Sequence, residues 1–223
     1  MKDRVVILGD SLSLPRPDDN IDYEDTYPYL LAKEGYEVLN RSRRANDTKI
    51  QTKQENLDND IHYLEPDMVV LHLGIVDCAP RLFYRLENKI ISQINKVIPI
   101  INFLSKYRYT LTRVFPKKYV SVKKFKKNIH QILDILQKKN IKVLVIGIAD
   151  TTEHNKSISY GFEHSILAYN QILKEATYQC SMVEYMDIYG LGAEVLLPDG
   201  IHLNKEMHKT LAKKLSVWIE KNR

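Results

Sequence analysis

Cysteine and long apolar runs are both scarce in this chain of 223 residues. The two cysteines, Cys78 and Cys180, are too few for a disulfide framework, and this favours a reducing compartment. No segment approaches the ~18 consecutive apolar residues that a membrane-spanning helix needs. The Val5–Leu8 run is also too short for the apolar core of a signal peptide. We therefore expect a soluble cytoplasmic protein.

Acidic residues are missing from one long stretch. No Asp or Glu lies between Asn88 and Leu133, which carries eleven Lys and Arg residues, although the net charge of the whole chain is only +5. A basic segment on an acidic body favours contact with an anionic partner. A solvated face on a pair of helices would give the same pattern, so both interpretations stay open.

The apolar pattern predicts a single α/β domain over residues 1–223. Hydrophobic residues make up 44% of the chain, which is typical of a folded protein. Short apolar runs bounded by turn residues predict five buried strands: Arg4–Leu8, Tyr36–Leu39, Met68–Leu73, Lys142–Ile148 and Met182–Met186. Helical spacing alternates with them over Thr26–Lys33, Thr48–Leu64, Leu86–Leu104, Phe125–Leu136, Gly161–Tyr178 and Lys205–Ile219. This alternation predicts a three-layer α/β sandwich around a parallel sheet.

One crossover is much longer than a single helix requires. Residues 81–127 hold the apolar stripe of 86–104, interrupted by Pro99, and then a mixture of aromatic and basic residues. We expect a basic helical insertion packed beside the functional site.

Three loops at strand or helix ends carry reactive residue types. Gly9-Asp10-Ser11 follows the first strand, Gly74-Ile75-Val76-Asp77 follows the third, and Asp199-Gly200-Ile201-His202 precedes the last helix. A serine becomes a nucleophile when a histidine takes its proton, and an acid on the other ring nitrogen orients that histidine. Ser11 could instead be a helix N-cap, but the Asp199 and His202 pair favours catalysis. The remaining histidines show no metal-ligand spacing.

The three loops resemble those of the SGNH/GDSL hydrolases. ILGDS, LGIVD and DGIH occur in the order expected for that family, from the first strand to the last helix. The resemblance implies a flavodoxin-like α/β/α sandwich and a Ser–His–Asp ester hydrolase without a metal or other cofactor. By matching position, Ser11 would be the nucleophile, His202 the base and Asp199 the residue that orients it.

The predicted oxyanion hole departs from the family pattern. The family uses the backbone N–H of the serine, a glycine after the second strand and an asparagine after the third, and here Ala45 and Val76 stand at the last two places. Alanine keeps the N–H, whereas valine offers no side-chain donor, and one lost donor costs ~10²–10³ in rate in a comparable enzyme. We expect another donor to replace it, with Arg81 as our first choice; the alternatives are that the chemistry differs or that the protein is not a catalyst.

The expected substrate contacts come from the same loops. They are Asp10, Arg16, Asn46, Gly74 and Asp77. Arginine has a fixed charge and several donors, so it suits a carboxylate or phosphate on the substrate. We expect an acyl-ester substrate, including O-acetyl groups on bacterial polysaccharides, and no nucleic-acid partner. The alternative is a degenerate SGNH domain that binds an anionic glycan, nucleic acid or membrane surface.

Overall fold

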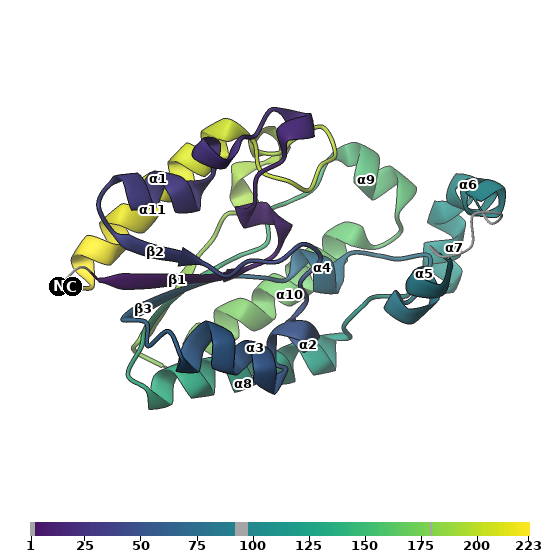
Figure 1. Ribbon diagram of the computed structural model, residues 1–223. Helices are drawn as coiled ribbons and strands as arrows, with labels where there is room; N and C mark the ends of the chain where they lie inside the picture. The colour runs from purple at the N-terminus through teal and green to yellow at the C-terminus, as the bar shows by residue number, and fades with distance from the viewer. Residues whose placement is uncertain (1–2, 92–97, 179) are drawn as a thin grey trace.

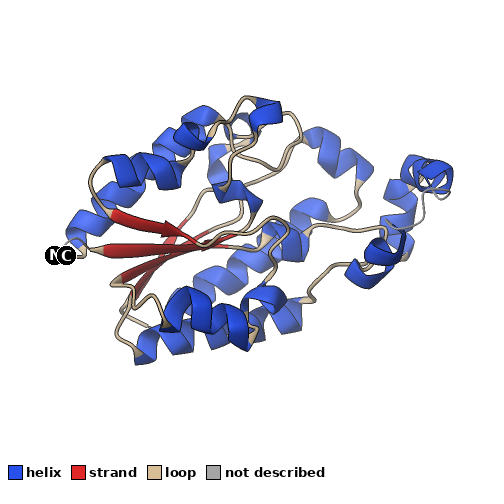
Figure 2. Cartoon of the chain, viewed as in Figure 1, coloured by secondary structure: helices blue, strands red, loops and turns tan. Residues whose placement is uncertain are grey.

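Five parallel strands form one central sheet in the computed structural model, which describes residues 3–91, 98–178 and 180–223 (Figures 1 and 2). The strand order is β2-β1-β3-β4-β5. The strands are β1 (Arg4–Gly9), β2 (Glu37–Asn40), β3 (Met68–His72), β4 (Lys142–Ile146) and β5 (Val183–Met186). Parallel strands covered on both faces are apolar throughout, and β3 is buried at every position. The five predicted strands are therefore all confirmed.

Helices cover both faces of the sheet. On one face lie α1 (Tyr27–Lys33) and α11 (Lys205–Lys221), which pack against each other (Figure 1). On the other lie α8 (Val122–Lys138) and α10 (Phe162–Thr177). This arrangement confirms the predicted three-layer α/β sandwich. None of the helices in the described ranges is both long and apolar enough to cross a bilayer.

The segment expected to be one helix over Thr48–Leu64 is broken instead. It forms α2 (Thr48–Gln51), α3 (Gln54–Leu57) and a π-helical turn over Asp58–His62. The Thr52 hydroxyl donates to the carbonyl oxygen of Thr48, and the Asn56 amide donates to that of Ile50 at 2.7 Å. These side chains occupy helical carbonyls, which is how Thr and Asn compete with a regular helix. The apolar spacing alone did not predict the break.

The helix α7 (Arg108–Val114) lies within the predicted helical insertion. Two other short helices were not predicted: α4 (Ile75–Cys78) and α9 (Glu153–Ile158). The last carries a recognisable start signal, because the Thr152 side chain accepts a hydrogen bond from the Asn155 N–H as an N-cap. The segment between the predicted strand Lys142–Ile148 and the predicted helical segment Gly161–Tyr178 therefore contains a helix of its own.

The long crossover is helical where the structure describes it. It contains α5 (Arg85–Ile91), α6 (Ile98–Lys106) and α7, and leads into α8. The predicted stripe of 86–104 is divided between α5 and α6, and its positions 92–97, which include Ile94 and Val97, lie outside the described residues. Figure 1 shows α5, α6 and α7 gathered beyond the carboxyl ends of the strands, away from both termini.

Candidate active site

Ser11 begins a 3-10 turn one residue after β1, an inner strand of the sheet. Asp10 caps this 3-10 turn by accepting a hydrogen bond from the Leu12 N–H at 2.9 Å. A Cβ atom at Gly9 would lie 2.6 Å from Ser42 Oγ and 2.8 Å from Ser13 Oγ, so only glycine fits there. The turn thus places the partly exposed Ser11 side chain at the carboxyl edge of the sheet.

The loop before α11 brings a histidine and a carboxylate to the same edge. His202 Nδ1 lies 2.6 Å from Asp199 Oδ2, and Ser11 Oγ lies 2.9 Å from His202 Nε2. A carboxylate only accepts hydrogen bonds, so the Nδ1 proton faces Asp199 and Nε2 is left to accept from the Ser11 hydroxyl. These three side chains form one continuous hydrogen-bonded chain.

Asp199 is held in its ionised form by its own loop. Its Oδ1 accepts hydrogen bonds from the N–H groups of Ile201 and His202 at 2.9 and 3.0 Å. Partial burial alone would raise the pKa of Asp199, but the hydrogen bonds from His202 and Ile201 outweigh it and lower the pKa below its ordinary value. The carboxylate is therefore suited to stabilising a histidine that gains a proton.

Two residues beside β4 support the histidine loop, and the sequence analysis missed both. Thr151 Oγ1 donates to the Gly200 carbonyl at 2.7 Å, and Asn155 Nδ2 donates to the Asp199 carbonyl at 2.8 Å. Gly200 has φ 68°, in the region that favours glycine, and a Cβ there would lie 2.5 Å from Thr152 Oγ1. The N-cap signal at the start of α9 was the available clue to this support.

Arg16 lies directly beside the serine and histidine. Its Nη1 is 3.1 Å from His202 Nε2, and its Nη2 is 3.6 Å from Asp199 Oδ2. Its Nε also pairs with Asp19 at 2.7 Å. The guanidinium and the Ser11 hydroxyl are therefore two donors aimed at one acceptor nitrogen. Of the residues expected to contact substrate, Arg16 is the one whose side chain lies against both His202 and Asp199.

The other expected substrate contacts are buried and engaged within the protein. Asp10, Asn46 and Asp77 are each at most 1% exposed. Asn46 Nδ2 donates to the Gly9 carbonyl at 3.0 Å, and Asp77 accepts from the Thr48 hydroxyl at 2.6 Å. Burial raises the pKa of Asp10 and that of Asp77 to about 7. In the structure these side chains position the loops, and their contact with a substrate stays a prediction.

Gly74 is also closed off. Its φ is 136°, and a Cβ atom there would lie 2.7 Å from Ile148 Cδ1. It therefore packs the third loop against the core, and its contact with a substrate stays a prediction.

Similarity to known proteins supplies the family. Residues 7–210 match the model of the GDSL-like lipase/acylhydrolase family. The chain belongs to this family. No curated protein sequence matches it.

Solved structures of esterases share the fold of this GDSL-like acylhydrolase. A lipase/acylhydrolase from Enterococcus faecalis superposes with a TM-score of 0.68 at 15% identity, covering 99% of this chain and 96% of that one. The acetyl xylan esterase AlAXEase gives a TM-score of 0.64 at 18% identity, with coverages of 97% and 99%. The esterase EstA from Pseudoalteromonas sp., inhibited by monoethylphosphonate, gives 0.59 at 15% identity, with coverages of 99% and 98%.

Ala45 of this GDSL-like acylhydrolase has an unusual backbone conformation. Its φ is 54°, in the left-handed region that favours glycine, the residue that the family pattern has there. Arg85, which the sequence analysis did not single out, donates to the Ala45 carbonyl at 2.8 Å and to Asp47 at 2.6 Å. These bonds fix the loop that carries the Ala45 N–H.

Arg81 lies in the insertion and stacks against an aromatic ring. Its guanidinium carbon is 4.6 Å from the centroid of the Tyr119 ring. The guanidinium carbon of Arg85 lies 4.7 Å from the same centroid. Burial lowers the pKa of Arg81. Among the described residues, none of the hydrogen bonds or ion pairs of Arg81 reaches Ser11 or Ala45. Its role as an oxyanion donor stays a prediction.

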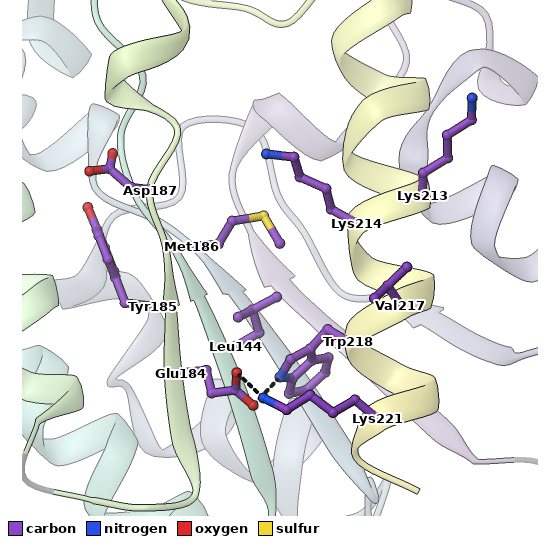
Figure 3. Close-up of a pocket in the computed structure, with 10 residues that line it drawn as sticks. All are labelled: Leu144, Glu184, Tyr185, Met186, Asp187, Lys213, Lys214, Val217, Trp218 and Lys221. Carbon is purple, nitrogen blue, oxygen red and sulfur yellow. Dashed lines mark hydrogen bonds and ion pairs between the residues drawn. The ribbon is translucent and has the colours of Figure 1, made fainter.

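Other features of the surface lie away from this site. A groove of about 580 Å³ runs between β5 and α11, with Leu144, Met186 and Trp218 on its floor (Figure 3). It includes none of the predicted site residues. Within the ranges that the structure describes, no cluster of three His, Cys, Asp or Glu residues is placed to hold a metal ion.

Proposed function

We propose that this acylhydrolase is a serine esterase in which Ser11 is the nucleophile, His202 the general base and Asp199 the residue that orients it. The observation that carries the proposal is the pair of contacts at 2.9 Å and 2.6 Å that links Ser11 through His202 to Asp199. The arrangement matches the requirement that a nucleophile, a base and an orienting acid lie in hydrogen-bonding reach.

The proposed reaction proceeds through an acyl-enzyme. Ser11 Oγ attacks the ester carbonyl carbon while its proton moves to His202 Nε2, and Asp199 stabilises the imidazolium. The tetrahedral intermediate then expels the alcohol, which takes the proton from Nε2. A water molecule, or a sugar hydroxyl in a transferase, loses its proton to His202 and attacks the acyl carbon. The second tetrahedral intermediate then expels Ser11 Oγ, which takes the proton back from Nε2. The N–H groups of Ser11 and Ala45 would hold the oxyanion.

We further propose a carbohydrate O-acetyl group as the substrate. A neighbour of the same fold acts on acetyl xylan by its name, which supports this choice. Arg16 adds a cation beside the reacting atoms, so an acetylated sugar that also carries a carboxylate or phosphate would fit this edge of the sheet. The position of Val76, buried where the family has a donor, favours the second candidate, a domain that binds such a glycan without catalysis.

A serine-directed probe distinguishes the two candidates. The protein is incubated with a fluorophosphonate, and the adduct is located by peptide mapping. We expect labelling at Ser11, its loss in Ser11→Ala, and slower labelling in His202→Ala. Ser42→Ala is the matched control. The Ser42 hydroxyl lies in the neighbouring loop, close to Gly9, and the proposed mechanism does not use it. Absence of labelling in folded wild-type protein would favour the binding domain.

The substrate is tested separately by acetate release. Acetylated xylan and an acetylated acidic polysaccharide are compared, and we expect a higher kcat/KM on the acidic one. Arg16→Ala should reduce this preference. The variant should lose less kcat/KM on a small neutral aryl acetate than on the acidic polysaccharide. Equal kcat/KM on both polymers would show that Arg16 does not select a substrate with a carboxylate or phosphate. The assignment of Ser11 as the nucleophile would be unaffected.

A further inference from the structure

Exposed apolar side chains are concentrated in the insertion. Fifteen large hydrophobic residues are exposed among those described, and eight of them lie between residues 84 and 115, about a seventh of the chain. They are Tyr84, Leu86, Ile90, Phe103, Tyr107, Tyr109, Val114 and Phe115. A soluble protein rarely leaves so many apolar groups together unless they contact something.

Basic residues accompany these apolar groups. Residues 84–118 contain eight Lys and Arg residues and a single acidic one, Glu87, which pairs with Lys117 at 2.8 Å. Lys106 on α6 and Arg113 on α7 are exposed next to the apolar positions. We call Phe103, Lys106, Tyr107, Arg113 and Phe115 the basic–aromatic surface.

The members of this surface come from two consecutive helices that pack together. The ring of Phe103 on α6 lies 5.2 Å, centroid to centroid, from the ring of Tyr107, the residue between α6 and α7. A groove of about 280 Å³ between α6 and α7 is lined by Leu104, Leu111 and Phe115 among others. The two helices stand at the end of the molecule beyond the sheet, so no layer of the sandwich covers their outer faces (Figure 1).

We infer that the basic–aromatic surface docks the protein on an anionic lipid bilayer. Helices that lie in the membrane interface combine apolar and aromatic side chains with Lys and Arg, and anionic headgroups attract the cations. A nucleic acid would neutralise the charge but leave Leu86, Ile90 and Val114 in water. A second copy of the chain would bring the same positive charges together. The bilayer is the partner that satisfies both kinds of side chain.

The docking surface is connected to the candidate active site. Arg108 on α7 donates to Ser159 Oγ at 2.6 Å, and the Tyr160 N–H donates to Thr112 Oγ1 at 2.9 Å, which joins α7 to the end of α9. The first turn of α9 holds the Asp199 loop through Asn155. Docking would therefore hold the loop of Asp199 and His202 near the lipid headgroups. The inference concerns binding alone and does not require that the site be catalytic.

Co-sedimentation with vesicles tests the inference. Full-length protein is mixed with vesicles of phosphatidylcholine and phosphatidylglycerol at 7:3, or of phosphatidylcholine alone, in low and high salt. We expect partitioning into the anionic vesicles to exceed that into neutral ones by ~10-fold or more, and salt to weaken it. A Ser11→Ala variant should bind equally well, which separates this result from the proposed esterase.

Paired variants identify the surface. A basic residue near an anionic membrane contributes about fivefold in affinity, so Lys106→Glu with Arg113→Glu should lower partitioning by ~25-fold or more. Phe103→Ser with Tyr107→Ser should lower it by ~10-fold. The matched controls, Lys213→Glu and Val217→Ser, alter exposed residues of α11 and should stay within about twofold of wild type.

Several results would overturn the inference. They are no binding to anionic vesicles, equal binding to both vesicle types, or an equal loss in the control variants. A dimer seen by light scattering and abolished by Phe103→Ser with Tyr107→Ser would show instead that the surface joins two copies of the chain. Circular dichroism of each variant confirms that the fold is retained, because the substituted side chains are exposed.

Discussion

Replacing Asp10 with asparagine should change how the stability of the protein depends on pH. The Asp10 carboxyl is fully buried, one oxygen accepts the Leu12 N–H, and the other has no hydrogen-bond partner among the described atoms. Burial raises its pKa from 3.8 to about 7. Asparagine keeps the acceptor for Leu12 but carries no charge at any pH.

The sign follows from which state binds the proton. Between pH 4 and 7 the native protein keeps a proton on Asp10 that the unfolded chain releases. The free energy of unfolding contributed by this group is therefore complete below pH ~4 and is lost as the pH rises towards 7. The rise in pKa from 3.8 to about 7 corresponds to a loss of about 4 kcal/mol.

The variant must be compared with wild type because other buried groups titrate in the same range. Burial raises the pKa of Asp77 to about 7, which adds a loss of the same sign. Burial lowers the pKa of His72 to about 3 and that of His208 to about 4, which gives the opposite slope between pH 4 and 6.5. The difference between Asp10→Asn and wild type isolates the one carboxyl.

Urea unfolding at several pH values measures this difference. Followed by the fluorescence of Trp218 between pH 4.5 and 8, Asp10→Asn should gain about 3–4 kcal/mol relative to wild type as the pH rises. Asp18→Asn changes an exposed carboxyl in the same loop and should show no comparable trend. A difference that stays constant with pH would refute the reasoning, because Asp10 would then be ionised in the native protein.

Three further changes test the site. Asp199→Asn should lower kcat by ~10⁴-fold, since an amide N–H facing Nδ1 reverses the histidine tautomer and removes the acceptor for Ser11; unchanged circular dichroism excludes unfolding. Ala45→Gly should raise the free energy of unfolding by about 1 kcal/mol in urea titrations, because the φ of 54° favours glycine. Arg81→Ala should lower kcat on an aryl acetate by ~10²-fold, and adding Val76→Asn should restore part of it; an unchanged kcat would place the third oxyanion donor elsewhere.

The three inner strands of the sheet, β1, β3 and β4, could be predicted from the sequence because they are buried on both faces. The runs at Arg4–Leu8 and Lys142–Ile148 are short and almost wholly apolar. This pattern is typical of a strand that is covered on both faces, and it is not the pattern of a helix with one exposed face. The break at Thr52 could not be predicted in the same way, because it depends on which carbonyl a hydroxyl happens to reach.

Some residues of the candidate site could be predicted from sequence motifs, and others could not. The positions of Ser11, Asp199 and His202 follow from motifs at the ends of strands and helices, which parallel topology brings to one edge. The burial of Asp10 and Asp77 was not predictable, because a carboxylate in a loop is normally solvated. Arg85 was missed because its partner, the Ala45 carbonyl, is a backbone group 40 positions away that no side-chain motif marks.

The distance along the chain between Ser11 and His202 has a consequence for folding. The two residues are 191 positions apart, yet the hydroxyl and the imidazole meet at 2.9 Å. During synthesis the serine turn is made with the first strand, whereas the histidine arrives only just before the last helix docks on α1. Contacts between such distant segments have the largest entropic cost of loop closure, and they form late in folding. Secondary structure should therefore recover before esterase activity when the unfolded protein is diluted out of urea, and nascent chains should stay inert until almost the whole polypeptide has emerged.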